Sequence, residues 1–229
     1  MIGRLLTVTL VLLLLGAVPV LSFLTARRSE LRFLPRINLY ASAVISQWLL
    51  AILTSGVIWL AGLGFAAAGF RAVPQGQFVA WSAAIGLGTL AALGLVIALE
   101  RLGWWPEESD LVHLLIPQTR LEKILAVFLV APTAAFCEEL IYRGFLFTQL
   151  LAWTDSVAWA LVISSFGFAL AHVYQGVHGM TRVALLGVLL TVPLIRTGSL
   201  FPSMAAHFLI DAVALAWLGP RFLRHERSV

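Results

Sequence analysis

Long apolar runs dominate this sequence and constrain its fold more than any other feature. A helix needs about 20 apolar residues to cross the hydrocarbon core of a bilayer. Runs of this kind recur along the chain, at residues 5–25, 38–62, 78–100, 121–151, 156–173, 179–196 and 200–218. Because 61% of the 229 residues are hydrophobic and only 11% are charged, a water-soluble fold could not cover this surface. The sequence therefore predicts an all-α membrane protein, a bundle of seven or eight transmembrane helices.

The helix count depends on the fourth run, 121–151, which contains Pro132 and several charged residues. This run is either one kinked helix or two short ones. The first run resembles a signal sequence, but it is longer than a signal core and no small-residue cleavage site precedes Arg27, which predicts a retained helix. We divide the chain into membrane helices with an interfacial loop (1–120), a second helical set (121–218) and a basic tail (219–229).

The charged residues lie mainly in the gaps between the apolar runs, where the net charge of +4 arises. The basic residues cluster in three places: Arg27, Arg28, Arg32 and Arg36; Arg101, Arg120 and Lys123; Arg221, Arg224 and Arg227. This positive-inside pattern predicts a multi-pass protein of the cell membrane with a cytoplasmic C-terminus. It also argues against nucleic acid as a partner, because no stretch alternates basic and aromatic residues. The acidic residues Glu107, Glu108 and Asp110 are expected in a solvated loop.

Three groups of polar residues interrupt the apolar runs of the second half. A charged residue at mid-membrane costs about 2.5–3.5 kcal/mol on insertion scales, and such residues usually mark function. In the first group, Glu139 and Arg143 are four residues apart and can pair on one helix face. Glu138 points about 100° away, which leaves one carboxylate able to accept a proton. The alternative is a helix end at which all three side chains meet water.

The second group is Phe168 with His172, and the third is His207 with Asp211, again four residues apart. A lone histidine at the edge of a span can be structural, and a His–Asp pair can merely satisfy itself. Together, however, polar groups on three separate apolar helices are expected to converge on one pocket, as a base, ligands and charge balance for hydrolysis. A transporter or proton relay is a rival interpretation, although the sequence shows no inverted repeat. Cys137, beside a carboxylate, is expected to be a small buried residue and not a nucleophile.

These residues resemble the three motifs of the CPBP family of intramembrane metalloproteases, which includes the type II CAAX prenyl endopeptidase. The family pattern is Glu-Glu-x-x-x-Arg, then Phe-x-x-x-His, then His-x-x-x-Asn or Asp. It stands here in that order, as Glu138, Glu139 and Arg143, then Phe168 and His172, then His207 and Asp211. The resemblance covers roughly residues 120–218, and the first half matches only as generic membrane helices. It implies a bundle of about eight helices with a polar cavity and an endopeptidase activity.

The resemblance also implies roles for single residues. Glu138 would activate water with the help of His172, and Arg143 would hold Glu139 and the helix geometry. His207 and Asp211 would stabilise the oxyanion of the tetrahedral intermediate. Because the family commonly has Asn at the last position and an anion is a poor oxyanion donor, Asp211 is better suited to orient His207 or to serve as a ligand.

The resemblance leaves cofactor and partners open. His172, His207 and Asp211 could hold one zinc or another divalent cation, and metal-free glutamate–histidine catalysis is equally open. The expected partners are membrane lipid and a peptide or lipidated protein substrate. The alternative function is a non-proteolytic peptide-binding or bacteriocin-immunity membrane protein. The oligomeric state is open, since the small residues around Gly62, Gly64 and Gly69 permit close helix contact but do not prove dimerisation.

Overall fold

The computed structural model describes residues 1–104 and 110–218, and every regular element in these ranges is a helix. Five helical stretches are long and apolar enough to cross a membrane: Ile2–Ala26, Arg36–Leu60, Gln75–Leu99, Arg120–Thr154 and Val173–Thr197. They coincide with five of the predicted runs. The all-α prediction is thus confirmed for the described residues, and these helices indicate a multi-pass membrane protein.

Two further apolar helices, Val157–Ala171 and Phe201–Trp217, coincide with the remaining predicted runs but are shorter. The first has 15 residues, and a helix of that length rises only about 22 Å. A bilayer core is about 30 Å thick, so this helix does not reach across it unaided. The expected total of seven or eight full spans therefore stays a prediction.

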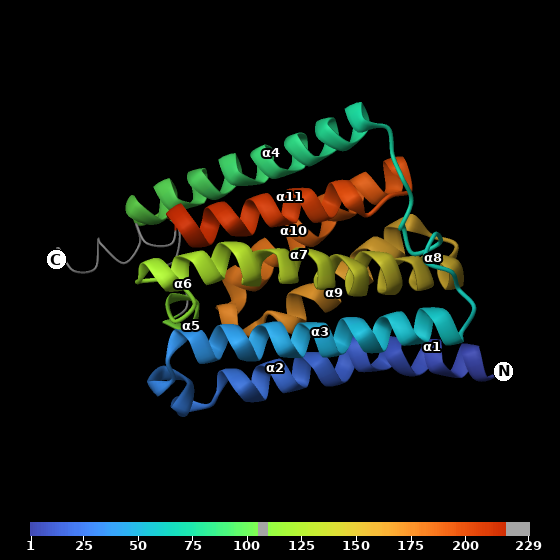
Figure 1. The fold of residues 1–229 in the computed structure, drawn as a ribbon, viewed down its shortest axis with the longest axis horizontal. Helices are drawn as coiled ribbons and strands as arrows, with labels where there is room; N and C mark the ends of the chain where they lie inside the picture. Colours follow the sequence, from blue (N-terminus) through green and yellow to red (C-terminus); the bar gives the residue numbers. More distant parts are fainter. Residues whose placement is uncertain (105–109, 219–229) are drawn as a thin grey trace.

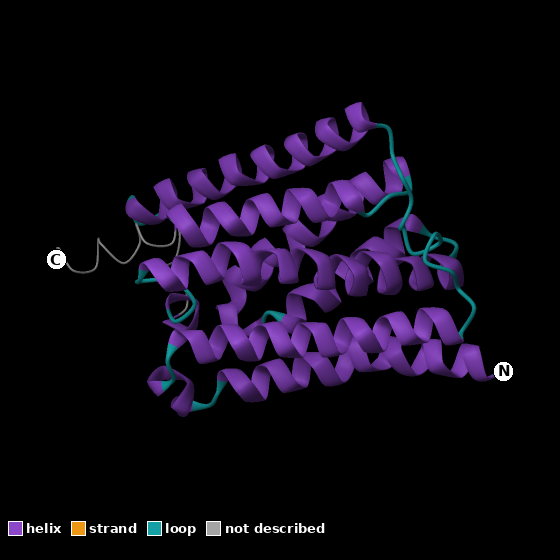
Figure 2. Cartoon of the chain, in the orientation of Figure 1, coloured by secondary structure: helices purple, strands orange, loops and turns teal. Residues whose placement is uncertain are grey.

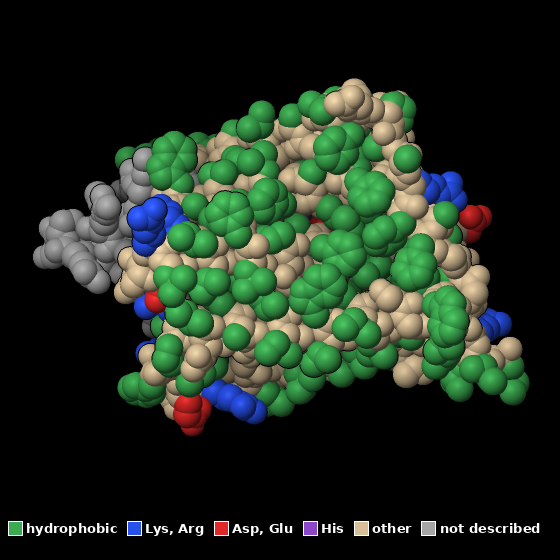
Figure 3. Space-filling view, in the orientation of Figure 1, with side chains coloured by type: hydrophobic (Ala, Val, Ile, Leu, Met, Phe, Trp, Pro, Cys, Tyr) green, Lys and Arg blue, Asp and Glu red, His purple; other side chains and the backbone are tan. Residues whose placement is uncertain are grey.

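The helices lie side by side along the long axis of the molecule, with α4 at one edge and α1 and α2 at the other (Figures 1 and 2). The α-helices are α1 (Ile2–Leu12), α2 (Val18–Ala26), α3 (Arg36–Leu60), α4 (Gln75–Arg101), α5 (Asp110–His113), α6 (Arg120–Leu125), α7 (Ala131–Glu138), α8 (Thr148–Thr154), α9 (Val157–Ala171), α10 (Gly176–Thr197) and α11 (Phe201–Val213). α1 and α2 form one continuous helix, as do α6, α7 and α8. In Figure 3, hydrophobic side chains cover the middle of the surface and most charged side chains gather at the ends, as a bilayer requires.

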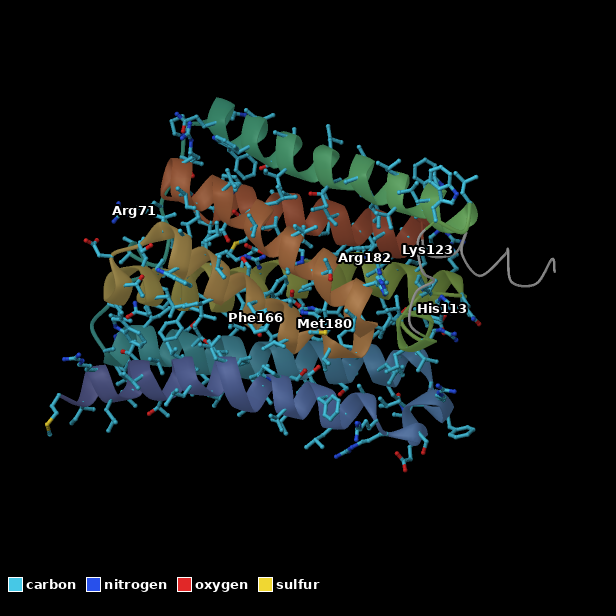
Figure 4. The ribbon with its side chains drawn as sticks, turned by 180° about the vertical axis from the view of Figure 1, so that it is seen from behind. Arg71, His113, Lys123, Phe166, Met180 and Arg182 are labelled. Carbon is cyan, nitrogen blue, oxygen red and sulfur yellow. The ribbon has the colours of Figure 1, made fainter. Side chains whose placement is uncertain are left out.

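Two of the three predicted basic regions lie at the same end of the bundle. Arg36 donates from Nε to the carbonyl of Ile116 at 3.1 Å, and the Tyr40 hydroxyl donates to the carbonyl of Leu115 at 2.8 Å. Figure 4 places His113 and Lys123 at this end and Arg71 at the opposite one. The tail 219–229, Glu107, Glu108 and the side chain of Asp110 lie outside what the structure describes. The cytoplasmic assignment of this end stays a prediction.

The fourth apolar run forms one continuous helix, Arg120–Thr154, and not two short ones. It begins at a capping box, in which Thr119 Oγ1 accepts from the Glu122 backbone and the Glu122 carboxylate accepts from the Thr119 backbone. A π-helical turn, Ala126–Val130, precedes Pro132, and a longer π-helical segment covers Glu139–Phe147. Such widened turns often occur at functional sites. This helix is the most buried of the five, with α3, α9 and α11 packed against it.

The predicted first helix is an integral part of this packing. It runs from Ile2 to Ala26, with α1 against α3 and α2 against α9. The hydroxyl of Ser22 donates to the carbonyl of Ala171 at 2.6 Å, and Leu14 is fully buried. The N-terminal helices therefore share interfaces with the second half of the chain.

The glycines expected to mediate helix contact have a different role. Gly62, Gly64 and Gly69 lie in the loop between α3 and α4 and have positive φ angles of 68°, 75° and 87°, which glycine tolerates without steric cost. They form turns and present no helix face. Gly69 and Gly144 both permit close packing, because an added Cβ would lie 2.7 Å from Leu194 Cδ1 at Gly69 and 2.9 Å from the carbonyl oxygen of Ala68 at Gly144. The loop between α3 and α4 therefore packs directly on the helix Arg120–Thr154, which we call the central helix, beside its polar residues.

Candidate active site

The three predicted polar groups meet in the middle of the bundle, carried by three helices. Glu138, Glu139 and Arg143 lie on the central helix, at the junction of α7 and the π-helical segment Glu139–Phe147. His172 caps the C-terminus of α9, and α11 carries His207 and Asp211. The alternative interpretation, in which these side chains meet water at a helix end, is wrong, because Glu139 is fully buried and Arg143 is 2% exposed.

Glu139 is the centre of a buried network. Its Oε1 accepts a hydrogen bond from Arg143 Nη1 at 2.9 Å and another from His207 Nδ1 at 2.8 Å. The first bond is the pair that the four-residue spacing predicts. Charge-assisted bonds of this length are strong inside a protein. The bond to Arg143 lies within one helix, and the bond to His207 joins that helix to α11. Glu139 Oε2 and Arg143 Nη2 are buried without a hydrogen-bond partner among the described residues.

The aromatic ring of Phe168 forms one wall of this network. The Arg143 guanidinium lies over the ring, 4.3 Å from its centroid, which is a cation–π contact. The ring also packs against His172 and His207, with centroid separations of 4.7 and 6.5 Å. Phe168 therefore contacts one charged residue of the network and both imidazoles, and it is itself 2% exposed.

A backbone carbonyl determines the tautomer of His172. Its Nδ1 lies 2.8 Å from the carbonyl oxygen of Phe168, and because a carbonyl only accepts, Nδ1 carries the proton. In the neutral ring, Nε2 then presents a lone pair. That atom lies 3.9 Å from Glu138 Oε1. His172 is thus arranged to accept a proton on the side that faces Glu138.

His207 is oriented by Glu139 and not by Asp211. Its Nδ1 donates to Glu139, and its Nε2 lies 3.8 Å from Glu138 Oε2 and 3.5 Å from Asp211 Oδ2. The resemblance favoured Asp211 as an orienting carboxylate for His207 or as a ligand. The structure places Asp211 beside the other nitrogen, the one that faces Glu138.

Glu138 is held less tightly than Glu139 and keeps some accessible surface. Its one close partner among the described residues is Gln47, whose Nε2 donates to Oε1 at 2.7 Å. The side chains of Glu138, His172 and Asp211 are 11%, 15% and 27% exposed. Figure 3 shows a small acidic patch in a recess among hydrophobic side chains at mid-bundle. The arrangement is therefore a mostly buried carboxylate beside two imidazoles.

Gln47 was missed at the level of sequence, where the first half of the chain appeared as generic membrane helices. The signal was present, because Gln47 is a strongly polar residue in the middle of the apolar run 38–62. Polar side chains at membrane depth usually face a partner or a cavity. Ser and Thr residues give a weaker signal, because many of them bond to their own helix, as Thr54 does to the Leu50 carbonyl.

The separations around Glu138 suit a bridging water better than direct bonds. Its two oxygens lie 3.9 and 3.8 Å from the Nε2 atoms of His172 and His207, beyond hydrogen-bond length. Polar groups at such a separation are commonly joined by one water molecule. A water in this position would contact a carboxylate and two imidazole nitrogens, which is the set of groups that proton transfer needs.

The same side chains have some features of metal ligands. Both imidazoles direct Nε2 inward and have Nδ1 held by an oxygen, as ligating histidines do. In the described ranges, however, no three His, Cys, Asp or Glu side chains are grouped closely enough to hold a metal. The predicted set of His172, His207 and Asp211 is not brought together in that way, and metal binding stays a prediction.

Cys137 has no place in this cluster. Cys137 is fully buried, as expected for a small packing residue.

Comparison with known protein families supports the resemblance that the motifs suggest. The family model described as "Type II CAAX prenyl endopeptidase Rce1-like" matches residues 120–213, which are 94 of the 229 residues. This segment contains all six polar residues of the three motifs. No curated protein and no solved structure matches the chain.

Proposed function

We propose, on the premise that residues 120–213 match a family of CAAX-type proteases, that this protein is an intramembrane endopeptidase in which Glu138 activates the attacking water. The observation that carries the proposal is the position of Glu138, whose two oxygens face the Nε2 atoms of His172 and His207 at 3.9 and 3.8 Å. Glu139 already accepts hydrogen bonds from Arg143 and His207. Its role is to hold the site together.

The chemistry follows from these positions. Glu138, with His172, takes a proton from the bridging water, and the water oxygen forms a bond to the carbonyl carbon of the peptide. His207 in its imidazolium form donates from Nε2 to the developing oxyanion, while Glu139 accepts from its Nδ1. The proton held by Glu138 then passes to the amide nitrogen as the C–N bond breaks. The products are a carboxylic acid and an amine, so one water is consumed for each bond.

The substrate is a peptide that reaches the middle of the bilayer, either as a membrane segment or through a lipid anchor. The site supports this because its polar groups lie in the bundle interior while apolar side chains form the surrounding surface. The family description names prenyl endopeptidases, and a prenylated C-terminal peptide is one member of the class to be tested. Membrane lipid is the surrounding solvent.

Cleavage by the reconstituted protein tests the proposal. Wild type in lipid vesicles is expected to cut at least one member of a panel of transmembrane, acylated and prenylated peptides, with products identified by mass spectrometry. The His172→Ala variant is expected to lose at least about 100-fold in rate, as for removal of a general acid–base group. If His172→Ala and Glu138→Ala both cut an authenticated substrate at the wild-type rate, the proposed mechanism is wrong.

A chelation experiment tests the metal question separately. Because the donors are not grouped as a metal site, the mechanism above contains no metal step. We expect activity to survive prolonged treatment with a membrane-compatible chelator, and elemental analysis to find less than one zinc per chain. Loss of activity on chelation and its recovery with zinc would instead assign His172, His207 and Asp211 as ligands.

A further inference from the structure

We infer that Gln47 is a positioning residue for Glu138, supplied by a part of the chain outside the family-matched segment. The inference rests on the proposed function, since it assigns Gln47 a role in the same reaction. Its basis is the 2.7 Å hydrogen bond from Gln47 Nε2 to Glu138 Oε1, the shortest contact that Glu138 makes with another described side chain. Gln47 would not touch the substrate and would act through Glu138.

The position of Gln47 is fixed by its neighbours on α3. The next residue, Trp48, donates from Nε1 to the hydroxyl of Thr133 at 3.3 Å. The Trp48 ring also stacks on Phe136, with centroids 5.4 Å apart. These two contacts join α3 to α7 at positions five and two residues before Glu138. Gln47 is therefore presented to Glu138 by a packed interface, which keeps the bond in register.

A neutral amide is a suitable donor for a catalytic carboxylate. Arg143 brings a full positive charge to Glu139, which balances that carboxylate. Gln47 holds one oxygen of Glu138 in place but leaves its charge uncompensated and available for a proton. The last side-chain torsion of a glutamate is broad, so without this bond the carboxylate would sample orientations in which Oε2 no longer faces His207. The bond thus selects the orientation in which both imidazoles face the carboxylate.

A purely structural role makes a different prediction. If Gln47 only shelters its own amide from lipid, an apolar side chain of the same length should serve better, because it has no polar group to satisfy. Gln47→Met is such a change, since methionine has similar length and volume. A structural role predicts that Gln47→Met is stable and fully active, whereas a positioning role predicts that it is stable and slow.

The experiment compares Gln47→Met with Thr133→Val in reconstituted, full-length protein. Thr133→Val removes the neighbouring hydrogen bond of the α3–α7 interface but leaves Glu138 untouched. Rates are measured well below the Tm of every variant, so that the folded fraction is the same. We expect kcat of Gln47→Met to fall at least about tenfold with KM unchanged, an effect of the size that losing a hydrogen bond to a charged group has, and Tm to fall only modestly. Thr133→Val is expected to keep the wild-type kcat.

A second variant covers the case in which Gln47→Met fails to fold. Gln47→Asn keeps the amide but is shorter by one methylene, so it cannot reach Glu138 from the same backbone position, and its kcat is expected to fall similarly. Wild-type kcat in either folded variant, with Glu138→Gln inactive, would overturn the inference and leave the proposed function standing. If Glu138→Gln is itself fully active, the proposed function fails, and the inference fails with it.

Discussion

Arg143→Met is expected to destabilise the bundle by about 3–5 kcal/mol, the usual cost of removing one partner of a buried ion pair. Arg143 is 2% exposed and donates to Glu139, which is fully buried. Without Arg143, Glu139 keeps one donor, His207, and the guanidinium contact with the Phe168 ring is lost. Thermal unfolding in detergent micelles measures the effect as a large fall in Tm.

The control for this prediction is Arg196→Met, at an exposed arginine near the end of α10, which is expected to leave Tm nearly unchanged. In the double variant Glu139→Gln/Arg143→Met, the amide oxygen at position 139 can still accept from His207 without an unbalanced charge. The double variant should therefore be more stable than Arg143→Met alone. Equal or lower stability of the double variant would show that the ion pair is not what stabilises this region.

Glu138→Gln is expected to lower kcat by about 10³-fold while the protein keeps its fold and its affinity for the peptide. Glutamine is nearly isosteric with glutamate, and its side-chain oxygen can still accept from Gln47, but it cannot take a proton from water. Peptide binding to the reconstituted variant, measured by fluorescence anisotropy, should give the wild-type Kd. Turnover measured on the same preparation should be almost absent.

The matched control is Glu30→Gln, which changes an exposed carboxylate far along the chain from the site and should leave kcat as it is. The Glu138→Gln variant also separates the proposed protease from the alternative of a peptide-binding or immunity protein. If cells expressing the variant are protected against a peptide toxin as well as wild-type cells are, binding alone is sufficient and cleavage is not the function. Protection that disappears with turnover supports the protease.

Much of the site could be predicted from sequence because its signals are local. Charged residues in an apolar run stand out whatever the fold, and the four-residue spacing of Glu139 and Arg143 already predicts their bond, seen at 2.9 Å. The same rule predicts that His207 and Asp211 share a helix face. They do share a face, at 3.5 Å, but the orienting partner of His207 comes from another helix. Spacing along one helix carries no information about competition from residues elsewhere in the chain.

The sequence by itself determined the helical class and the membrane environment, because backbone hydrogen bonding in lipid allows long apolar segments little other than helix. It also predicted six of the polar residues that lie together in the structure. Only the tertiary structure decided that Glu139 is the one closed in by Arg143 and His207, that Glu138 faces both imidazoles, and that Gln47 on α3 completes its surroundings. These assignments depend on how helices far apart in sequence are rotated and packed against one another. The sequence of a single segment does not predict side-chain packing of that kind.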